Sequence, residues 1–128
     1  MSDSVPRRAT VLVVEDEPGL RELMVEELVD AGFEVVDAEI GHAAIAIIDS
    51  GRPIDVLFTD IRLPGVHDGW QIAQHAREVH PEIHVIYASG YSGDLSAQVP
   101  NSLYVRKPYL PAAIIAEITG RLDAPAAR

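Results

Sequence analysis

The chain has 128 residues, a length that fits one domain of ordinary size and leaves no room for a second. Twenty Asp and Glu against ten Lys and Arg give a formal net charge of -10, which repels phosphate backbones and anionic lipid headgroups, so we expect no nucleic-acid partner and no membrane partner. Cysteine is absent, and no run approaches the roughly 20 apolar residues of a membrane span or forms a signal peptide, so the sequence predicts a cytoplasmic protein.

Five short apolar runs predict β-strands. Their continuous apolarity indicates strands that are covered on both faces, as in a parallel sheet. The predicted strands are residues 11–14, 33–36, 54–59, 83–88 and 103–105.

Longer amphipathic segments separate these runs and predict helices. The helices are expected from Pro18 to a stop at Gly32, over about 43–49, from Asp68-Gly69 to just before Pro81, and over about 111–122. A further helix is hard to place between Ser89 and Leu103, where the chain has room for about two turns at 95–99. Alternating strands and helices imply right-handed crossovers, so the predicted fold class is α/β, with a doubly wound five-stranded parallel sheet.

Four charged residues are predicted to sit where hydrophobic strands stop: Glu15, Asp16, Asp60 and Lys107. In an open parallel sheet the carboxyl ends of neighbouring strands converge on one crevice. Three carboxylates about 5 Å apart would repel one another by roughly 3 kcal/mol per pair at an effective dielectric constant of 20. Lys107 would offset part of this repulsion, and an all-oxygen cluster also suits Mg²⁺. The alternative is that Glu15 and Asp16 only cap the following helix and that Asp60 only caps the next turn.

Ser89 ends the fourth run beside Gly90, and Lys107 precedes Pro108. A hydroxyl, an ammonium group and backbone N–H groups are the donors that phosphoryl oxygens require. Taken singly, Ser89 could be a turn residue and Lys107 a solvated charge. Their shared position at strand ends, with the acids, predicts a phosphoryl site.

These motifs, in this order, resemble the receiver domain of bacterial two-component response regulators, over about residues 9–122. The resemblance implies the flavodoxin-like strand order 2-1-3-4-5, with tails at 1–8 and 123–128. The matching segments are Val11-Leu-Val-Val-Glu15-Asp16-Glu17-Pro18, Asp60-Ile-Arg-Leu-Pro64-Gly65, Asp68-Gly69, Ala88-Ser89-Gly90 and Tyr104-Val-Arg-Lys107-Pro108.

The resemblance also implies a role for each residue. Asp60 would accept a phosphoryl group from a histidine kinase or a histidine phosphotransfer protein. Lys107 would pair with the phosphoryl oxygens, Ser89 would move to bond one of them, and Tyr104 would swing inward in response. The Lys107-Pro108 bond would be cis. The Mg²⁺ ligands would be Glu15, Asp16, Asp60 and the backbone carbonyl of Arg62.

The chain departs from the family in two segments. Gly65, Val66 and His67 make the spacing from Pro64 to Asp68-Gly69 longer than usual, which should bulge the loop beside Asp60. Lys107 follows Ser89 by only 18 positions, so the fourth helix of the family should be shortened or replaced by a loop. The end of the fourth strand is similar to a subgroup of single-domain receivers that reads Phe-Ala-Thr-Gly-Tyr there, and we hypothesise that Tyr91 shields the acyl phosphate.

The histidines share no spacing typical of a metal site, so solvated or capping roles are expected for them. Of the five, which are His42, His67, His75, His80 and His84, only His67 should be carried close to Asp60. Trp70 is expected to pack rather than to bind.

The leading interpretation is a receiver with no DNA-binding output domain, which acts through contacts with an unknown downstream protein. A weak homodimer is compatible with the sequence. One alternative is a receiver fragment of a hybrid histidine kinase. Two others are a phosphatase with an aspartyl nucleophile, although Arg62 stands where such enzymes place a second acid, and an interaction module that never meets phosphate.

Overall fold

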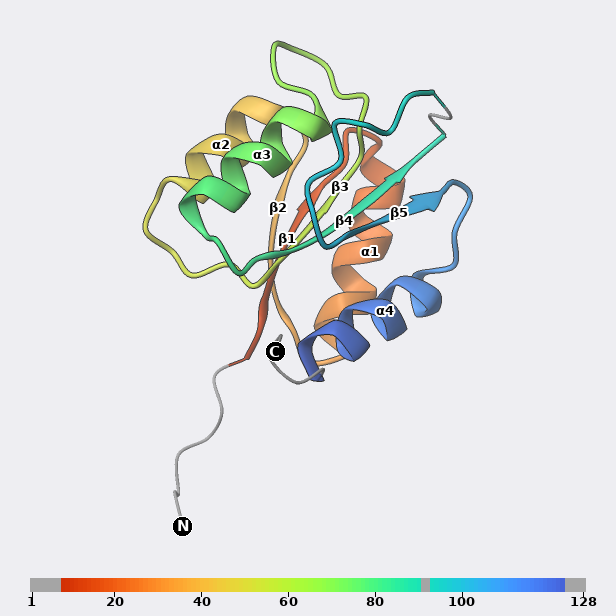
Figure 1. Ribbon diagram of the computed structural model, residues 1–128. Helices are drawn as coiled ribbons and strands as arrows, with labels where there is room; N and C mark the ends of the chain where they lie inside the picture. The colour runs from red at the N-terminus through yellow and green to blue at the C-terminus, as the bar shows by residue number, and fades with distance from the viewer. Residues whose placement is uncertain (1–7, 91–92, 124–128) are drawn as a thin grey trace.

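A five-stranded parallel sheet runs through the middle of the computed structural model, which describes residues 8–90 and 93–123 (Figure 1). The sheet order is β2-β1-β3-β4-β5, which confirms the predicted doubly wound topology. The strands are β1 (Thr10–Val14), β2 (Glu34–Ala38), β3 (Val56–Thr59), β4 (His84–Ser89) and β5 (Ser102–Arg106). The helices are α1 (Pro18–Asp30), α2 (Gly41–Ile48), α3 (Gly69–Val79) and α4 (Pro111–Asp123).

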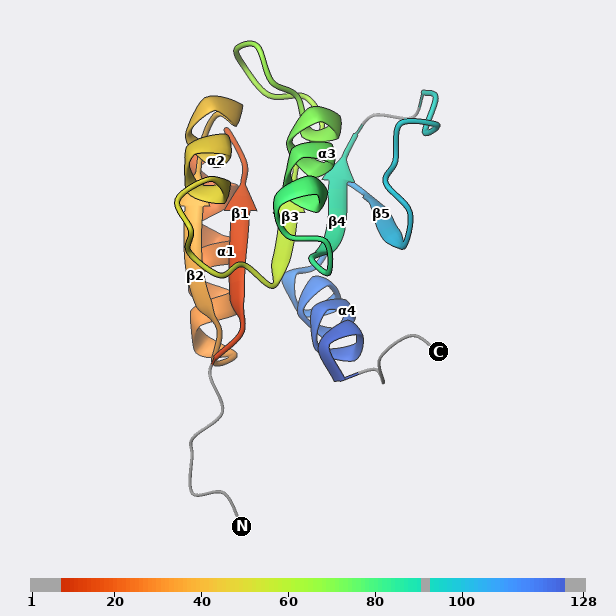
Figure 2. The same cartoon turned by 60° about the vertical axis from the view of Figure 1, so that its left-hand side comes forward.

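Two hydrophobic cores hold the helices against the sheet. Side chains alternate along each strand, so Leu57 and Tyr87 face α2 and α3, whereas Phe58 and Ile86 face α1 and α4. Figure 1 shows α2 and α3 on one side of the strands and α1 and α4 on the other, and in Figure 2 α2 and α3 come to the front. Each fully buried large apolar side chain stabilises the fold by about 1.5–3 kcal/mol, so both faces contribute to stability.

The edge strands are less buried than the sequence suggested. β1 and β3 are buried throughout, as is β4 after its first residue, but β2 and β5 are mostly half-buried or exposed. The prediction of full burial on both faces is therefore wrong for β2 and β5. Each of these strands has a neighbour on one side only, and so part of its surface meets solvent.

The predicted helices are present, with their ends shifted by a few residues. α1 begins with Pro18 in its first turn, and Gly32 follows it with φ +100°. α2 begins at Gly41, two residues earlier than expected. α3 begins after Asp68, whose side chain accepts from the backbone N–H of Gln71 while the Gln71 side chain accepts from the backbone N–H of Asp68. This capping box fixes the start of α3.

The β4–β5 connection contains no helix within its described part, which is residue 90 and residues 93–101. The expectation that the fourth helix is shortened or replaced by a loop is confirmed, and the room at 95–99 holds a single turn. One backbone bond, from Gln98 to the Leu95 carbonyl at 3.0 Å, closes a single turn. The next amide, that of Val99, donates to the Tyr87 hydroxyl at 3.1 Å instead of to a helical carbonyl.

The start of β1 and the end of α4 lie at the same end of the molecule (Figure 1). They are opposite the edge of the sheet at which the strands finish. Within the described residues, no helix has both the length and the apolar character that crossing a bilayer requires.

Candidate functional site

Three carboxylates meet at the carboxyl edge of the sheet. Glu15 follows β1 and Asp60 follows β3, which are neighbouring strands with Val14 opposite Thr59. Glu15, Asp16 and Asp60 each offer an oxygen within 4.8 Å of the others. Glu15 and Asp60 are only 4% and 8% exposed, whereas Asp16 is exposed, so the cluster opens to solvent on one side.

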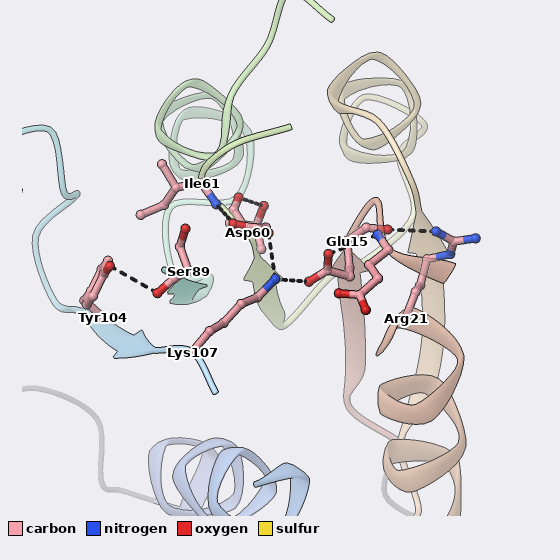
Figure 3. A network of polar contacts seen from close by, with 9 residues as sticks. Glu15, Arg21, Asp60, Ile61, Ser89, Tyr104 and Lys107 are labelled. Carbon is pink, nitrogen blue, oxygen red and sulfur yellow. Dashed lines mark hydrogen bonds and ion pairs between the residues drawn. The ribbon is translucent and has the colours of Figure 1, made fainter. Parts of the chain in front are cut away.

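Lys107 bridges two of these acids. Its Nζ lies 2.8 Å from Glu15 Oε1 and 2.8 Å from Asp60 Oδ2, between the two carboxylates (Figure 3). Lys107 follows β5, so its side chain reaches past β4 to meet them. Its backbone N–H donates to the Ser89 carbonyl at 3.0 Å, and the Lys107-Pro108 bond is cis, as predicted. The strand-end charges therefore come together as their positions in the sequence indicated.

The cluster keeps an excess of negative charge. Burial alone would lower the pKa of the Lys107 ammonium, but its hydrogen bonds to Asp60 and Glu15 outweigh burial and raise this pKa above its ordinary value. Burial raises the pKa of the Glu15 carboxyl, and the Lys107 bond opposes part of that shift. With oxygens within 4.8 Å, each pair of carboxylates repels by about 3 kcal/mol at a dielectric constant of 20. One ammonium cannot balance three carboxylates, and their oxygens are the ligands that a hard divalent cation prefers.

Backbone groups orient the two buried carboxylates. Asp60 Oδ1 accepts from the Ile61 N–H at 2.6 Å, and Glu15 Oε2 accepts from the Glu17 N–H at 3.1 Å. These bonds resemble the local capping that was the alternative reading of the acids. However, the residue before α1 is Glu17, whose side chain makes no capping bond, and the second oxygen of each buried acid turns to Lys107. Local capping therefore explains the contact of one oxygen of each buried acid, but not the contact of the other oxygen with Lys107.

Gly69 brings α3 against the backbone of Asp60. A Cβ at this position would lie 2.1 Å from the Asp60 carbonyl oxygen and 2.7 Å from Ile61 Cα. The Gly69 N–H donates to the Ile61 carbonyl at 2.7 Å. Only a glycine permits this approach, so the Asp68-Gly69 pair both starts the helix and supports the acidic cluster.

The loop between β3 and α3 rises above the edge of the sheet as the long green segment of Figure 1. Gly65 has φ +95°, and Val66 beside it is 87% exposed. The backbone of His67 lies against α2, where a Cβ on Gly41 would come within 2.5 Å of its carbonyl oxygen. Arg62 is exposed at the start of this loop, and the role of its carbonyl as a metal ligand stays a prediction.

Ser89 and Tyr104 contact each other beyond Lys107 and Asp60, on the side away from Glu15 (Figure 3). Ser89 is 3% exposed at the end of β4, and the Tyr104 hydroxyl donates to its carbonyl at 3.3 Å (Figure 3). Trp70 lies farther along the same face, with its ring 4.7 Å from that of Tyr87, which confirms its expected packing role. Tyr91 lies outside the described residues, so its shielding of an acyl phosphate stays a hypothesis.

Two histidines join the helices of one layer. His75 Nε2 lies 2.6 Å from Asp49 Oδ1, and His80 Nε2 lies 3.2 Å from the Ile48 carbonyl. Both contacts tie α3 to the end of α2, which is a structural role of the expected kind.

Two tyrosines were missed by reasoning from the sequence. Tyr87 lies inside an apolar run and reads as a core residue, yet its hydroxyl holds the β4–β5 connection at Val99. Tyr109 follows Lys107-Pro108 and packs on Phe58, with ring centroids 5.5 Å apart. In the sequence, the position of Tyr109 two residues after Lys107 was the only indication that it lies near the acids.

Comparisons with known proteins agree with this geometry. The family model described as the response regulator receiver domain matches residues 11–119. The crystal structure of a response regulator receiver protein from Sinorhizobium medicae WSM419 superposes with a TM-score of 0.87 and 37% identity, over 92% of this chain and 97% of that chain. The receiver domain of the hybrid histidine kinase CckA superposes with a TM-score of 0.78 and 27% identity, over 90% of this chain and 100% of that chain.

Curated sequences give the same result. The sensor kinase CckA of Brucella abortus is 36% identical over 91 residues, which are 70% of this chain but 10% of that protein. The response regulator receiver protein CpdR of the same organism is 29% identical over 82 residues, which are 64% of this chain and 67% of that protein. The chain spans half or less of the length of most of the first curated relatives.

Proposed function

This chain belongs to the response regulator receiver family, and on that premise we propose that it is the phospho-accepting component of a two-component phosphorelay, with Asp60 as the acceptor. The observation that carries the proposal is the double contact of Lys107 with Glu15 and Asp60 at the carboxyl edge of the sheet. This contact places a cation beside the carboxylate that would receive a phosphoryl group. The working unit would be residues 9–122, flanked by short segments at 1–8 and 123–128.

In the proposed transfer, one carboxylate oxygen of Asp60 attacks the phosphorus of a phosphohistidine on a kinase or phosphotransfer protein. The phosphorus–nitrogen bond breaks, its electron pair stays on the imidazole, and an acyl phosphate forms on Asp60. The Ile61 N–H, bound to Asp60 Oδ1 at 2.6 Å, keeps the carboxylate oriented during this step. Lys107 turns from Asp60 Oδ2 to the phosphoryl oxygens, so positioning and charge supply most of the catalysis.

The acidic cluster would complete the site. Glu15, Asp16, Asp60 and the Arg62 carbonyl would hold Mg²⁺, which when bound neutralises charge on the phosphoryl oxygens. Glu15 is oriented for this role by the Glu17 N–H, which holds its Oε2. The exposed position of Asp16 leaves the cluster open to solvent on one side.

The signal would pass through Ser89 and Tyr104. In the proposed switch the Ser89 hydroxyl moves to donate to a phosphoryl oxygen, and this movement disturbs the Tyr104 bond to the Ser89 carbonyl. Tyr104 then shifts on β5, next to the β4–β5 connection. The phosphorylated carboxylate gains charge and acceptor oxygens, which biases the surface that a downstream protein reads.

The test is labelling by a small phosphodonor. Wild-type protein incubated with acetyl phosphate and Mg²⁺ should gain the mass of one phosphoryl group in intact-mass spectrometry, and Asp60→Asn should not. Asp30→Asn, which removes an exposed carboxylate at the end of α1, is the matched control and should be labelled like the wild type. Equal labelling of Asp60→Asn and the wild type would contradict the proposal.

A second candidate is favoured by the 36% identity to the sensor kinase CckA, namely that the chain serves as the receiver of a hybrid histidine kinase. Phosphotransfer from each purified histidine kinase and phosphotransfer protein of its own cell separates the two. A receiver of this second kind should also pass its phosphoryl group on to a phosphotransfer protein, whereas a receiver of the first kind should only accept one.

A further inference from the structure

Tyr109 lies on the same face of the sheet as the buried acids. Its ring contacts Phe58 edge-on, with the centroids 5.5 Å apart and the planes at 82°. Phe58 and Asp60 are two residues apart. The hydrogen-bond ladder between β1 and β3 extends to Asp60, whose backbone N–H donates to the Val14 carbonyl. Because side chains alternate along a strand, Phe58 and Asp60 point to one face, and so do Val13 and Glu15. Tyr109 therefore sits beside the acids on the side covered by α1 and α4.

The hydroxyl of Tyr109 is buried and has no hydrogen-bond partner among the described residues. Such groups are rare in folded proteins, since nothing offsets the loss of their contact with water. Burial raises the pKa of this phenol, and the carboxylate of Glu15 raises it further, more than any other charge. Tyr109 thus keeps a hydroxyl without a described partner on the side of the sheet toward which the acids point.

We propose that Tyr109 is a positioning residue whose hydroxyl donates to Glu15 when Lys107 turns toward the phosphoryl group on Asp60. The inference rests on the proposed function. In the unphosphorylated structure Glu15 Oε1 accepts from Lys107 and Oε2 accepts from the Glu17 N–H, so each oxygen has one donor and keeps a further lone pair that Mg²⁺ can use. The turn of Lys107 leaves Oε1 without its donor, and the buried Tyr109 hydroxyl takes that place. Glu15 then keeps its orientation while the ammonium serves the phosphoryl oxygens.

The substitution Tyr109→Phe tests this role because it removes the hydroxyl and keeps the ring on Phe58. The probe is beryllium fluoride with Mg²⁺, which stands in for the phosphoryl group, and its affinity is measured by isothermal titration calorimetry. We expect the affinity of Tyr109→Phe to fall about tenfold, as for the loss of a hydrogen bond to a charged group. Without Mg²⁺ and beryllium fluoride, its urea unfolding midpoint should equal or exceed that of the wild type, because the lost hydroxyl has no partner there.

A lower affinity together with an equal or higher unfolding midpoint separates a positioning role from a packing role, because a packing defect would lower both the affinity and the midpoint. Equal affinity of Tyr109→Phe and wild type would overturn the inference and leave the assignment of Asp60 intact. A lower unfolding midpoint of the ligand-free variant would also overturn it, since the hydroxyl would then have a partner already. Failure of the wild type to bind the probe would overturn the proposed function together with the inference.

Discussion

The substitution Gly69→Ala should destabilise the protein by an amount that follows from the contact between α3 and Asp60. The new Cβ would lie 2.1 Å from the Asp60 carbonyl oxygen, against the 3.4 Å at which ordinary contact begins. The atoms it meets belong to the backbone and cannot rotate away, so the start of α3 must move and its 2.7 Å bond to the Ile61 carbonyl must lengthen. Overpacking and the lost bond each cost about 1–3 kcal/mol, and the better helix propensity of alanine returns about 1 kcal/mol. The expected net loss is about 3 kcal/mol.

Urea unfolding followed by circular dichroism measures this loss. Gly120→Ala in α4 is the matched control, since a Cβ there meets nothing within 4 Å, and it should stabilise the protein by up to about 1 kcal/mol. Gly69→Ala should also weaken Mg²⁺ binding, because displacement of α3 pulls on the backbone of Asp60. If Gly69→Ala proved as stable as Gly120→Ala, the reasoning that Gly69 is required by close approach would be refuted.

Two further predictions concern Lys107 and Tyr87. Lys107→Met removes the ammonium that contacts Glu15 and Asp60, so thermal unfolding in EDTA should occur at a lower temperature than for the wild type. Added Mg²⁺ should raise the unfolding temperature of the variant by more than that of the wild type. Equal shifts would show that Lys107 does not offset the repulsion between the carboxylates. Tyr87→Phe leaves the buried Val99 N–H without its acceptor, so the free energy of unfolding in urea should fall by about 1–3 kcal/mol. An unchanged unfolding midpoint would mean that this bond does not hold the β4–β5 connection.

The sheet and the meeting of the charges could be predicted because both depend on patterns that are local in the sequence. Each apolar run ends at a charged or hydroxyl residue, and parallel topology brings such ends to one edge. Glu15, Asp60 and Lys107 are therefore expected at one edge, where Lys107 Nζ lies 2.8 Å from an oxygen of each acid.

The remaining features depend on residues that are distant in the sequence. The Val99 N–H donates to the Tyr87 hydroxyl, a contact that no periodicity at 95–99 could reveal, and the segment forms one turn instead of a short helix. The partial burial of β2 and β5 follows from their position at the sheet edges rather than from their composition. The position of Tyr109 near the acids follows only from the fold, which packs its ring on Phe58.

Both ends of the described domain point away from the acidic cluster, since β1 starts and α4 finishes at the opposite end of the molecule. A reporter protein fused at either end, or a linker to a sensor chip, would leave the approach to Asp60 open. A phosphodonor as large as a kinase could then dock while the domain is tethered. The same arrangement favours surface-based binding measurements, in which a partner is injected over immobilised domain and the phosphorylated and unphosphorylated forms are compared directly.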